Sequence, residues 1–249
     1  MLTTLIVPLI LAPQTINVSW DIEGTKRIAI AYIPEQPKNA PLVFIWHGHG
    51  GSAKHSQNAY AIHKEWPEAM VLYMEGLPTP GKTDPEGKRR GWQRLKGEQG
   101  DRDLKLFDKA LDWAKATYKI DSKRVYSGGH SNGGAFTYLL WSDRREQIAA
   151  VAPSGAGFGR NWSYAKPMPA LIIAGERDQI VPFENQMLSL KASMRINKCD
   201  SEKGEKLGPL MTLYKPASGG AQIVTYIYPG THKMPDDTGK KMVEFFKRH

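Results

Sequence analysis

One pentapeptide decides the fold of this chain, and it reads Gly129-His130-Ser131-Asn132-Gly133. The apolar run 124–127 before it predicts a strand, and residues 134–141 after it predict a helix. A strand, a sharp turn and a helix around Gly-x-Ser-x-Gly are typical of a turn that exposes a serine hydroxyl. Glycine suits the outer positions because a Cβ there would collide with its neighbours. The N–H of Asn132 begins the helix, so it is free to bind an anion.

Chance alone can also produce this pattern in glycine-rich loops, and the chain contains 24 glycines. The rest of the sequence therefore has to support the interpretation. Its 249 residues, 41% of them hydrophobic and 24% charged, suit one large α/β domain, and no internal repeat or second domain is evident. The single cysteine, Cys199, allows neither an intramolecular disulfide nor a cysteine-based metal site.

The formal net charge of +9 raises the question of a nucleic-acid partner. Lysines and arginines are scattered and interleaved with acidic residues, however, and no nucleic-acid-binding motif is present. We therefore expect no nucleic-acid partner. The charge indicates a solvated basic surface, or at most attraction to acidic polymers.

The N-terminal stretch 5–12 is apolar but too short to span a bilayer as a helix. It has the length of a signal-peptide core with cleavage near Ala12, and we expect a secreted or periplasmic protein. Against export, no Lys or Arg precedes the stretch, Pro8 interrupts it, and Pro13 poorly suits the position after a cut. A first strand or an ordered arm is the alternative. Residues 13–249 are expected to form the folded domain, and we expect no integral membrane segment.

Alternating or continuous apolar runs predict further strands and helices along the chain. The strands are expected at 27–33, 42–46, 70–74, 148–152, 170–174 and 223–228, and the helices at 52–66, 101–118, 184–197 and from 237. Strands that alternate with helices indicate an α/β fold, with a mostly parallel central sheet covered by helices on both faces. Residues 199–222 are polar and basic and are interpreted as a surface excursion.

A glycine-rich segment, His47-Gly48-His49-Gly50-Gly51, directly follows the predicted buried strand 42–46. Backbone N–H groups of such a loop can approach a ligand closely, and we expect the N–H of His49 to join that of Asn132 in binding an oxyanion. His47 and His49 also form a His-x-His pair, but no acidic partner nearby supports a metal site. We expect His47 to be structural and no metal ion to be bound.

A long segment without periodicity, residues 75–93, is interpreted as a loop that borders the site. Trp92, near the end of this loop, is expected to form a wall for substrate. The alternative is a structural role, in which the aromatic ring anchors the loop to the body of the domain. The helix that follows carries Asp101 and Asp103 in its first turn, where the helix dipole favours carboxylates. We interpret these two as capping and loop-tethering groups.

Three chemically suited residues follow predicted strands in the order Ser131, Asp178, His232. Serine is a poor nucleophile until a base removes its proton, and histidine is the natural base near neutral pH. A carboxylate would hold the imidazole in the required tautomer. Glu176 is the rival for that role.

The remaining histidines are worse placed for the base. His130 lies inside the turn next to Ser131, His55 and His63 lie on a predicted helix, and His249 is terminal. The order Ser, Asp, His is that of the α/β-hydrolase superfamily, which the chain resembles.

Within that superfamily the chain is most similar to polyhydroxybutyrate depolymerases, feruloyl esterases and acetylxylan esterases, the carbohydrate esterase family 1-like group. The likeness runs from about residue 41 to the C-terminus. It is carried by the segments 47–51, 75–77, 91–92, 101–107, 124–134, 150–153 and 175–182 and by His232. Because the Arg-Asp-x-x-Val-Pro turn at 177–182 matches this group, the resemblance favours Asp178 over Glu176 as the acid.

Two departures from the family pattern are visible. Relatives often have Trp-Pro shortly after the catalytic histidine, whereas here Lys233, Met234 and Pro235 follow His232, so an aromatic wall is missing. Cys199 resembles a position that is disulfide-bonded in some relatives, but it has no partner cysteine in this chain. No separate carbohydrate- or polymer-binding domain is evident, which favours soluble esters or oligomers.

The resemblance implies a serine esterase that works through an acyl-enzyme and needs no cofactor. Feruloyl or acetyl esters on a polysaccharide are the expected substrates. A hydroxyalkanoate oligomer is the first alternative, a peptide bond is a weaker one, and a catalytically silent binding module is the alternative outside enzymes. The sequence leaves the oligomeric state open.

Overall fold

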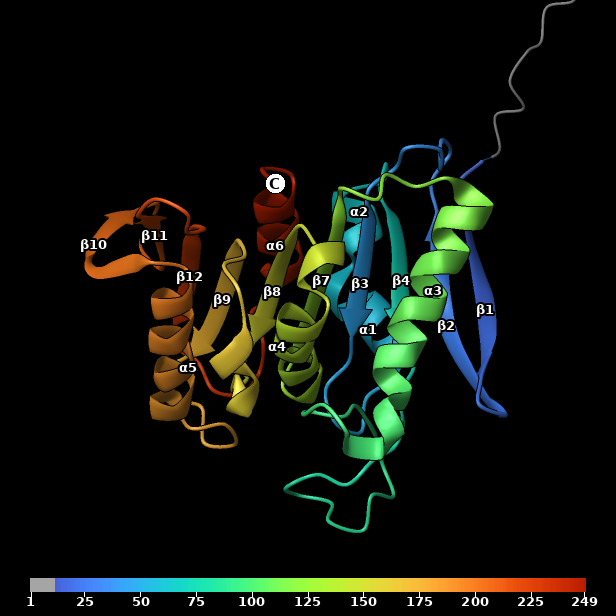
Figure 1. Cartoon of the computed structure of the whole chain (residues 1–249), viewed down its shortest axis with the longest axis horizontal. Coiled ribbons are helices and arrows are strands. Elements are labelled where there is room, and N and C mark those ends of the chain that lie inside the picture. The colour runs from blue at the N-terminus through green and yellow to red at the C-terminus, as the bar shows by residue number, and fades with distance from the viewer. Residues whose placement is uncertain (1–11) are drawn as a thin grey trace, which may run out of the picture.

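The computed structural model describes residues 12–249, and a ten-stranded twisted sheet runs through its whole width (Figure 1). The strand order is β1-β2-β4-β3-β7-β8-β9-β12-β11-β10. The six strands from β4 to β12 pair in parallel, and the two strands at each edge pair antiparallel. The predicted α/β class with a mostly parallel sheet is confirmed.

The strands of this sheet are β1 (Gln14–Ile22), β2 (Thr25–Ile33), β3 (Leu42–Trp46), β4 (Met70–Met74), β7 (Val125–His130), β8 (Ala150–Ser154), β9 (Ala170–Gly175), β10 (Cys199–Lys206), β11 (Met211–Pro216) and β12 (Ile223–Tyr228). The short strands β5 (Leu77–Pro78) and β6 (Arg90–Gly91) form a separate two-stranded ribbon.

Helices cover both faces of the sheet, as Figure 1 shows. One face carries α3 (Arg102–Tyr118), α4 (Asn132–Asp143) and α5 (Phe183–Ile196). The other face carries α1 (Ala53–Tyr60), α2 (Ile62–Glu65) and α6 (Thr238–Phe246). Three short 3₁₀ helices complete the described part of the chain: η1 (Glu98–Asp101), η2 (Arg145–Gln147) and η3 (Gly159–Tyr164).

Burial explains why the central strands read as continuous apolar runs. Every residue of β3, β4 and β9 is buried, because helices cover both sides of each strand. The helix α3 instead buries one stripe, formed by Leu104, Phe107, Leu111 and Ala114, and exposes lysines on the opposite face. The two faces of the sheet thus form two separate hydrophobic clusters.

Three elements differ from the sequence-based expectation. The strand β1 was not expected, although Ile16, Val18, Trp20 and Ile22 alternate with polar residues along it. The predicted helix 52–66 is broken into α1 and α2 at Ala61, which has a positive φ of 46°. The segment 199–222 is a β-hairpin that extends the sheet edge rather than an irregular excursion, and its strand β10 is almost wholly exposed.

The apolar stretch 5–12 lies almost entirely outside the described residues, so export and cleavage stay predictions. Within residues 12–249, the helices are all too short or too polar to cross a bilayer.

The loops that follow four of the parallel strands lie at the same edge of the sheet. His47 follows β3, Ser131 follows β7, Asp178 follows β9 and His232 follows β12. Carboxyl ends of neighbouring parallel strands are the usual place for a ligand site in open α/β sheets.

Candidate active site

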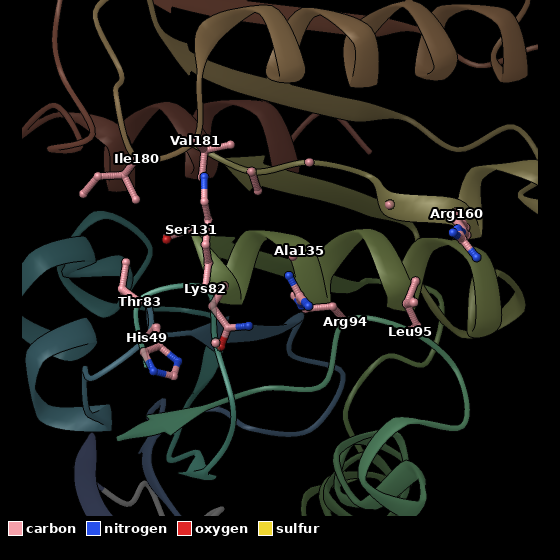
Figure 2. Close-up of a pocket in the computed structure, with 15 residues that line it drawn as sticks. His49, Lys82, Thr83, Arg94, Leu95, Ser131, Ala135, Arg160, Ile180 and Val181 are labelled. Atoms are coloured by element: carbon pink, nitrogen blue, oxygen red, sulfur yellow. The ribbon is translucent and has the colours of Figure 1, made fainter. Parts of the chain in front are cut away.

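Ser131 stands at the junction between β7 and α4 with strained backbone angles, φ 56° and ψ −120°. Two backbone hydrogen bonds hold it there: its N–H donates to the carbonyl of Ser154 at 2.8 Å, and its carbonyl accepts from the N–H of Ala135 at 2.9 Å. Such angles cost roughly 1–3 kcal/mol and persist only where the surroundings enforce them. Their effect here is to place the serine hydroxyl at the N-terminus of α4 (Figure 2).

Close backbone packing around the turn explains its glycines. A Cβ on Gly133 would lie 2.2 Å from the carbonyl oxygen of Trp46, and one on Gly129 would lie 2.5 Å from the carbonyl oxygen of Gly133. A Cβ on Gly48 would lie 3.5 Å from the Cβ of Ser131. The glycine-rich loop after β3 therefore packs directly on the serine turn.

The side chains of Ser131, His232 and Asp178 form a hydrogen-bonded chain. Ser131 Oγ lies 2.9 Å from His232 Nε2, and His232 Nδ1 lies 2.7 Å from Asp178 Oδ2. Because Asp178 Oδ2 also accepts from Gln186 Nε2, the proton of a neutral His232 is best placed on Nδ1, which leaves Nε2 free to accept the hydroxyl proton. The structure thus brings together the three residues that the sequence singled out.

The carboxylate of Asp178 is buried and held from both sides. Its Oδ1 accepts from the backbone N–H groups of Ile180 and Val181, each at 2.9 Å. Glu176, the rival from the sequence, is exposed to solvent, and the hydrogen bond to His232 comes from Asp178. The geometry therefore favours Asp178 as the partner of the imidazole.

The backbone N–H groups of His49 and Asn132 have no hydrogen-bond acceptor among residues 12–249. The loop that carries His49 is fixed by bonds from Gly50 N–H to the Arg90 carbonyl at 2.7 Å and from Gly51 N–H to the Gly48 carbonyl at 2.9 Å. Two unpaired N–H groups beside a serine hydroxyl suit the binding of an oxyanion.

The side chains of His47 and His49 have separate partners and do not converge on a metal site. His47 is buried, its Nε2 accepts from the N–H of Gly76 at 2.9 Å, and its Nδ1 lies 2.7 Å from the Gly48 carbonyl. Burial lowers the pKa of His47. His49 Nε2 instead lies 3.1 Å from Asp84. Within the described part of the chain, no cluster of three or more His, Cys, Asp or Glu side chains could hold a metal ion.

Trp92 does not form a wall for substrate, which corrects the expectation from the sequence. Its ring is only 1% exposed, it stacks on Phe136 and meets Trp46 edge-on, and its Nε1 donates to the carbonyl of His47 at 2.9 Å. The backbone of Trp92 also exchanges two hydrogen bonds with the amide of Asn132. Trp92 pins the loop to the serine turn, which was the alternative interpretation.

The carboxylates at the start of α3 hold this loop too. Asp103 is buried, pairs with Arg27 at 2.7 Å and accepts from the N–H of Gln93 at 2.8 Å. Asp101 accepts from the side chain of Gln93 and from the N–H of Gly97, each at 2.8 Å. Their predicted role as tethers of the loop is confirmed, whereas the side chain of Asp101 makes no capping hydrogen bond to α3.

His130 lies closer to the site than the sequence suggested. Its ring centroid is 4.7 Å from that of His232, and its Nδ1 lies 3.0 Å from Ser154 Oγ. Burial and the neighbouring His232 lower the pKa of His130 to about 4. A neutral imidazole thus packs against the proposed base.

A cavity of about 390 Å³ opens beside Ser131 and Asn132 (Figure 2). Its wall comes from the 75–93 loop, the segment 94–95, the start of α4, the segment 156–160 and the turn after β9. Sequence reasoning missed three basic side chains in this wall: Lys82, Arg94 and Arg160. None of residues 199–222 lines the cavity.

Comparisons with known proteins agree with this architecture. No protein-family model matches the chain. It is 32% identical over 134 residues to a bifunctional acetylxylan esterase/xylanase of Neocallimastix patriciarum, a match that covers 50% of this chain and 20% of the relative. It is 28% identical over 215 residues to feruloyl esterase D of Neurospora crassa, covering 82% of this chain and 68% of the relative.

Solved structures of low sequence identity share the fold. An acetyl xylan esterase from Aspergillus awamori superposes with a TM-score of 0.68 at 16% identity, covering 90% of this chain and 94% of the other. A CE1 ferulic acid esterase from Anaeromyces mucronatus gives 0.59 at 13% identity, covering 94% and 90%.

Both sequence relatives are named as esterases, and the resemblance expected from the sequence is confirmed. By fold this chain is an α/β-hydrolase, and feruloyl and acetylxylan esterases are among its relatives.

Proposed function

We propose that this protein is a serine esterase in which Ser131 is the nucleophile, His232 the general base and acid, and Asp178 the residue that orients His232. The hydrogen-bonded chain from Ser131 Oγ through His232 to Asp178, at 2.9 and 2.7 Å, is the observation that carries the proposal. The relatives named as esterases support the ester as the reacting group.

Acylation begins when Ser131 Oγ attacks the ester carbonyl and its proton passes to His232 Nε2. The carbonyl oxygen becomes an oxyanion that accepts from the N–H groups of His49 and Asn132. Loss of one such donor typically costs about 3 kcal/mol of transition-state stabilisation. The intermediate collapses as the bond to the alcohol oxygen breaks, and that oxygen takes the proton from His232.

Deacylation repeats these steps with water. His232 Nε2 takes a proton from a water molecule that attacks the acyl-enzyme, and the proton then returns to Ser131 Oγ as the acid leaves. Asp178 stabilises the imidazolium in both halves of the reaction and stays a carboxylate throughout. These steps use only groups of the chain and water.

Feruloyl or acetyl esters attached to a polysaccharide are the substrate class that we propose. The names of the two sequence relatives, an acetylxylan esterase/xylanase and a feruloyl esterase, support this choice. The cavity of about 390 Å³ beside Ser131 is large enough for an aromatic acyl group or a sugar unit.

A panel of esters tests the function and the substrate class together. Wild type and Ser131→Ala are assayed on p-nitrophenyl acetate, methyl ferulate, acetylated xylan and a hydroxybutyrate oligomer. We expect hydrolysis of the acetyl or feruloyl esters by the wild type and none by the variant. Activity that survives Ser131→Ala contradicts the mechanism, and preference for the oligomer moves the protein to the hydroxyalkanoate group. A folded wild type that hydrolyses no ester contradicts the function.

Export is a separate proposal that depends on the apolar stretch 5–12. Expression of the chain with its N-terminus intact, followed by mass measurement of protein from the medium or periplasm, tests it. A mature N-terminus near Pro13 supports export, and uncleaved protein confined to the cytoplasm contradicts it.

A further inference from the structure

The cavity beside Ser131 is lined by basic residues and by no acidic one. Lys82, Arg94 and Arg160 come from three separate segments: the 75–93 loop, the stretch before η1, and η3. Figure 2 shows Lys82 and Arg94 on the side of Ser131 and Ala135, and Arg160 at the other end near Leu95. Three cations therefore share one cavity with the proposed nucleophile.

Basic residues that are close to these three in the sequence form ion pairs within the described part of the chain, whereas the three cations do not. Arg89 pairs with Asp84 at 3.7 Å, Arg90 with Glu75 at 2.9 Å and Lys96 with Asp143 at 3.0 Å, and none of these basic residues lines the cavity. Among residues 12–249, Lys82, Arg94 and Arg160 have no acidic partner within ion-pair distance. The cavity thus keeps its positive charge available to a ligand.

Carboxylates beside the cavity already have hydrogen-bond partners, including Glu98, which accepts from the backbone N–H groups of Arg94 and Leu95. Asp178 accepts four hydrogen bonds, from His232, Gln186, Ile180 and Val181. Asp84 accepts from the N–H groups of Lys88 and Arg89 and lies 3.1 Å from His49 Nε2. None of these carboxylates forms an ion pair with Lys82, Arg94 or Arg160.

From this arrangement we propose that the cavity binds a carboxylate carried by the substrate, so that the preferred ester belongs to an acidic polysaccharide that contains uronic acid. This inference rests on the proposed esterase function and narrows its substrate class. Arginine suits the role because its guanidinium matches a carboxylate with two parallel hydrogen bonds. The net charge of +9 further favours association with a polyanion.

Pairs of esters that differ in one carboxylate test the inference. For a carboxylate on the acyl side, the mono-p-nitrophenyl ester of glutaric acid is compared with its methyl-capped diester. For a carboxylate on the alcohol side, acetylated oligogalacturonate is compared with acetylated xylo-oligosaccharide. The measured quantity is the ratio of kcat/KM for the anionic ester to that for the neutral one, at an ionic strength of about 10 mM, where screening is weak.

We expect the wild-type ratio to exceed one for at least one pair, and that pair shows which side of the ester enters the cavity. Arg94→Gln and Arg160→Gln should each lower the ratio about three- to tenfold, and Lys82→Gln about threefold, as expected for partly exposed contacts to a carboxylate. Lys240→Gln is the matched control, because Lys240 is exposed on α6 and lines no cavity beside the serine. This control removes the same charge and should keep the wild-type ratio.

Three outcomes overturn the inference. A wild-type ratio at or below one for both pairs excludes recognition of a carboxylate. A ratio that Arg94→Gln, Arg160→Gln and Lys82→Gln leave unchanged excludes this cavity, and an equal fall in Lys240→Gln shows an effect of net charge alone. If the neutral esters are hydrolysed and Ser131→Ala abolishes this, the proposed function stands while the inference fails. If no ester is hydrolysed, both fail.

Discussion

The floor of the site and its wall are built in different ways. The floor consists of Ser131, Asp178 and His232 at the ends of buried strands, where backbone atoms pack so closely that a Cβ at Gly133 has no room. The wall, in the sense used from here on, is the part of the cavity lining that comes from the 75–93 loop and the segments 94–95 and 156–160. Its basic side chains are exposed. Side-chain contacts of Asp84 and Arg89 hold the outer part of the loop.

This difference separates chemistry from specificity. Changes in the floor should damage catalysis or folding, because its geometry is set by backbone packing and buried hydrogen bonds. Changes in the wall should alter which ester is preferred without unfolding the protein. The following predictions test that division, from the largest expected effect to the smallest.

Asp178→Asn should cause the largest loss, because an amide cannot both accept from Nδ1 of His232 and stabilise the imidazolium. We expect kcat on p-nitrophenyl acetate to fall roughly 10³- to 10⁴-fold with a small change in KM. Glu176→Gln, two residues away and exposed, is the control and should behave like the wild type. Near-normal activity of Asp178→Asn would remove Asp178 from the mechanism.

Gly133→Ala should destabilise the floor through a steric clash, without removing any reacting group. Its Cβ would lie 2.2 Å from the Trp46 carbonyl oxygen and 2.6 Å from that of His47. We expect the free energy of unfolding, measured by urea denaturation, to fall by about 3 kcal/mol or more. Gly208→Ala, which meets no atom within 4 Å, should change it by less than about 0.5 kcal/mol. Equal stability of the two variants would contradict the tight packing of the serine turn.

Lowering the pH should reduce the free energy of unfolding through His130, whose ring packs against His232 of the floor. Its folded-state pKa of about 4 lies below the ordinary 6.5, so between these values the unfolded chain binds a proton that the folded chain does not. Stability should therefore fall as the pH drops from about 6.5 to about 4, with about 2–3 kcal/mol due to this residue. His232 and Asp178 are the titratable groups that act on the pKa of His130, and both are unchanged in sequence in the test variant, His130→Gln.

Urea denaturation of His130→Gln and wild type across this range measures the effect. His47, His63 and His249 also have lowered pKa values, so some dependence on pH should remain in the variant. The variant should nevertheless show a shallower slope than the wild type. Identical slopes would show that His130 takes up its proton as easily when folded as when unfolded.

Asp84→Asn should give the smallest effect, because it changes the wall. An amide loses at least one of the bonds to the Lys88 and Arg89 N–H groups and to His49. We expect KM to rise about threefold while kcat stays within about twofold. Glu86→Gln on the same loop, whose carboxylate is exposed, is the control. A collapse of kcat in Asp84→Asn would show that the wall also positions the reacting groups.

The floor could be predicted from the sequence because each of its residues directly follows an apolar run. Strands β3, β7, β9 and β12 are recognisable by composition, and parallel pairing brings their carboxyl ends together. Gly129 and Gly133 indicated, from the sequence alone, that the backbone packs closely around the serine turn. The catalytic roles of Ser131, Asp178 and His232 stay predictions until they are measured.

The wall could not be predicted because it depends on contacts between distant segments. Nothing near Lys82, Arg94 or Arg160 in the sequence shows that they meet in one cavity. The burial of Trp92 likewise depends on Trp46 and Phe136, which lie far from it in the chain. The strand β10 carries almost only exposed polar residues, so its sequence has no hydrophobic pattern that would predict a strand.

The most direct test of the central claim, that Ser131 is an activated nucleophile, is covalent labelling with a fluorophosphonate. Folded wild-type protein is treated with the probe, digested and mapped by mass spectrometry, beside Ser131→Ala and His232→Ala. We predict one adduct on Ser131 of the wild type, none in Ser131→Ala, and strongly slowed labelling in His232→Ala. A folded wild type that stays unlabelled, or that is labelled on another residue, would contradict the claim.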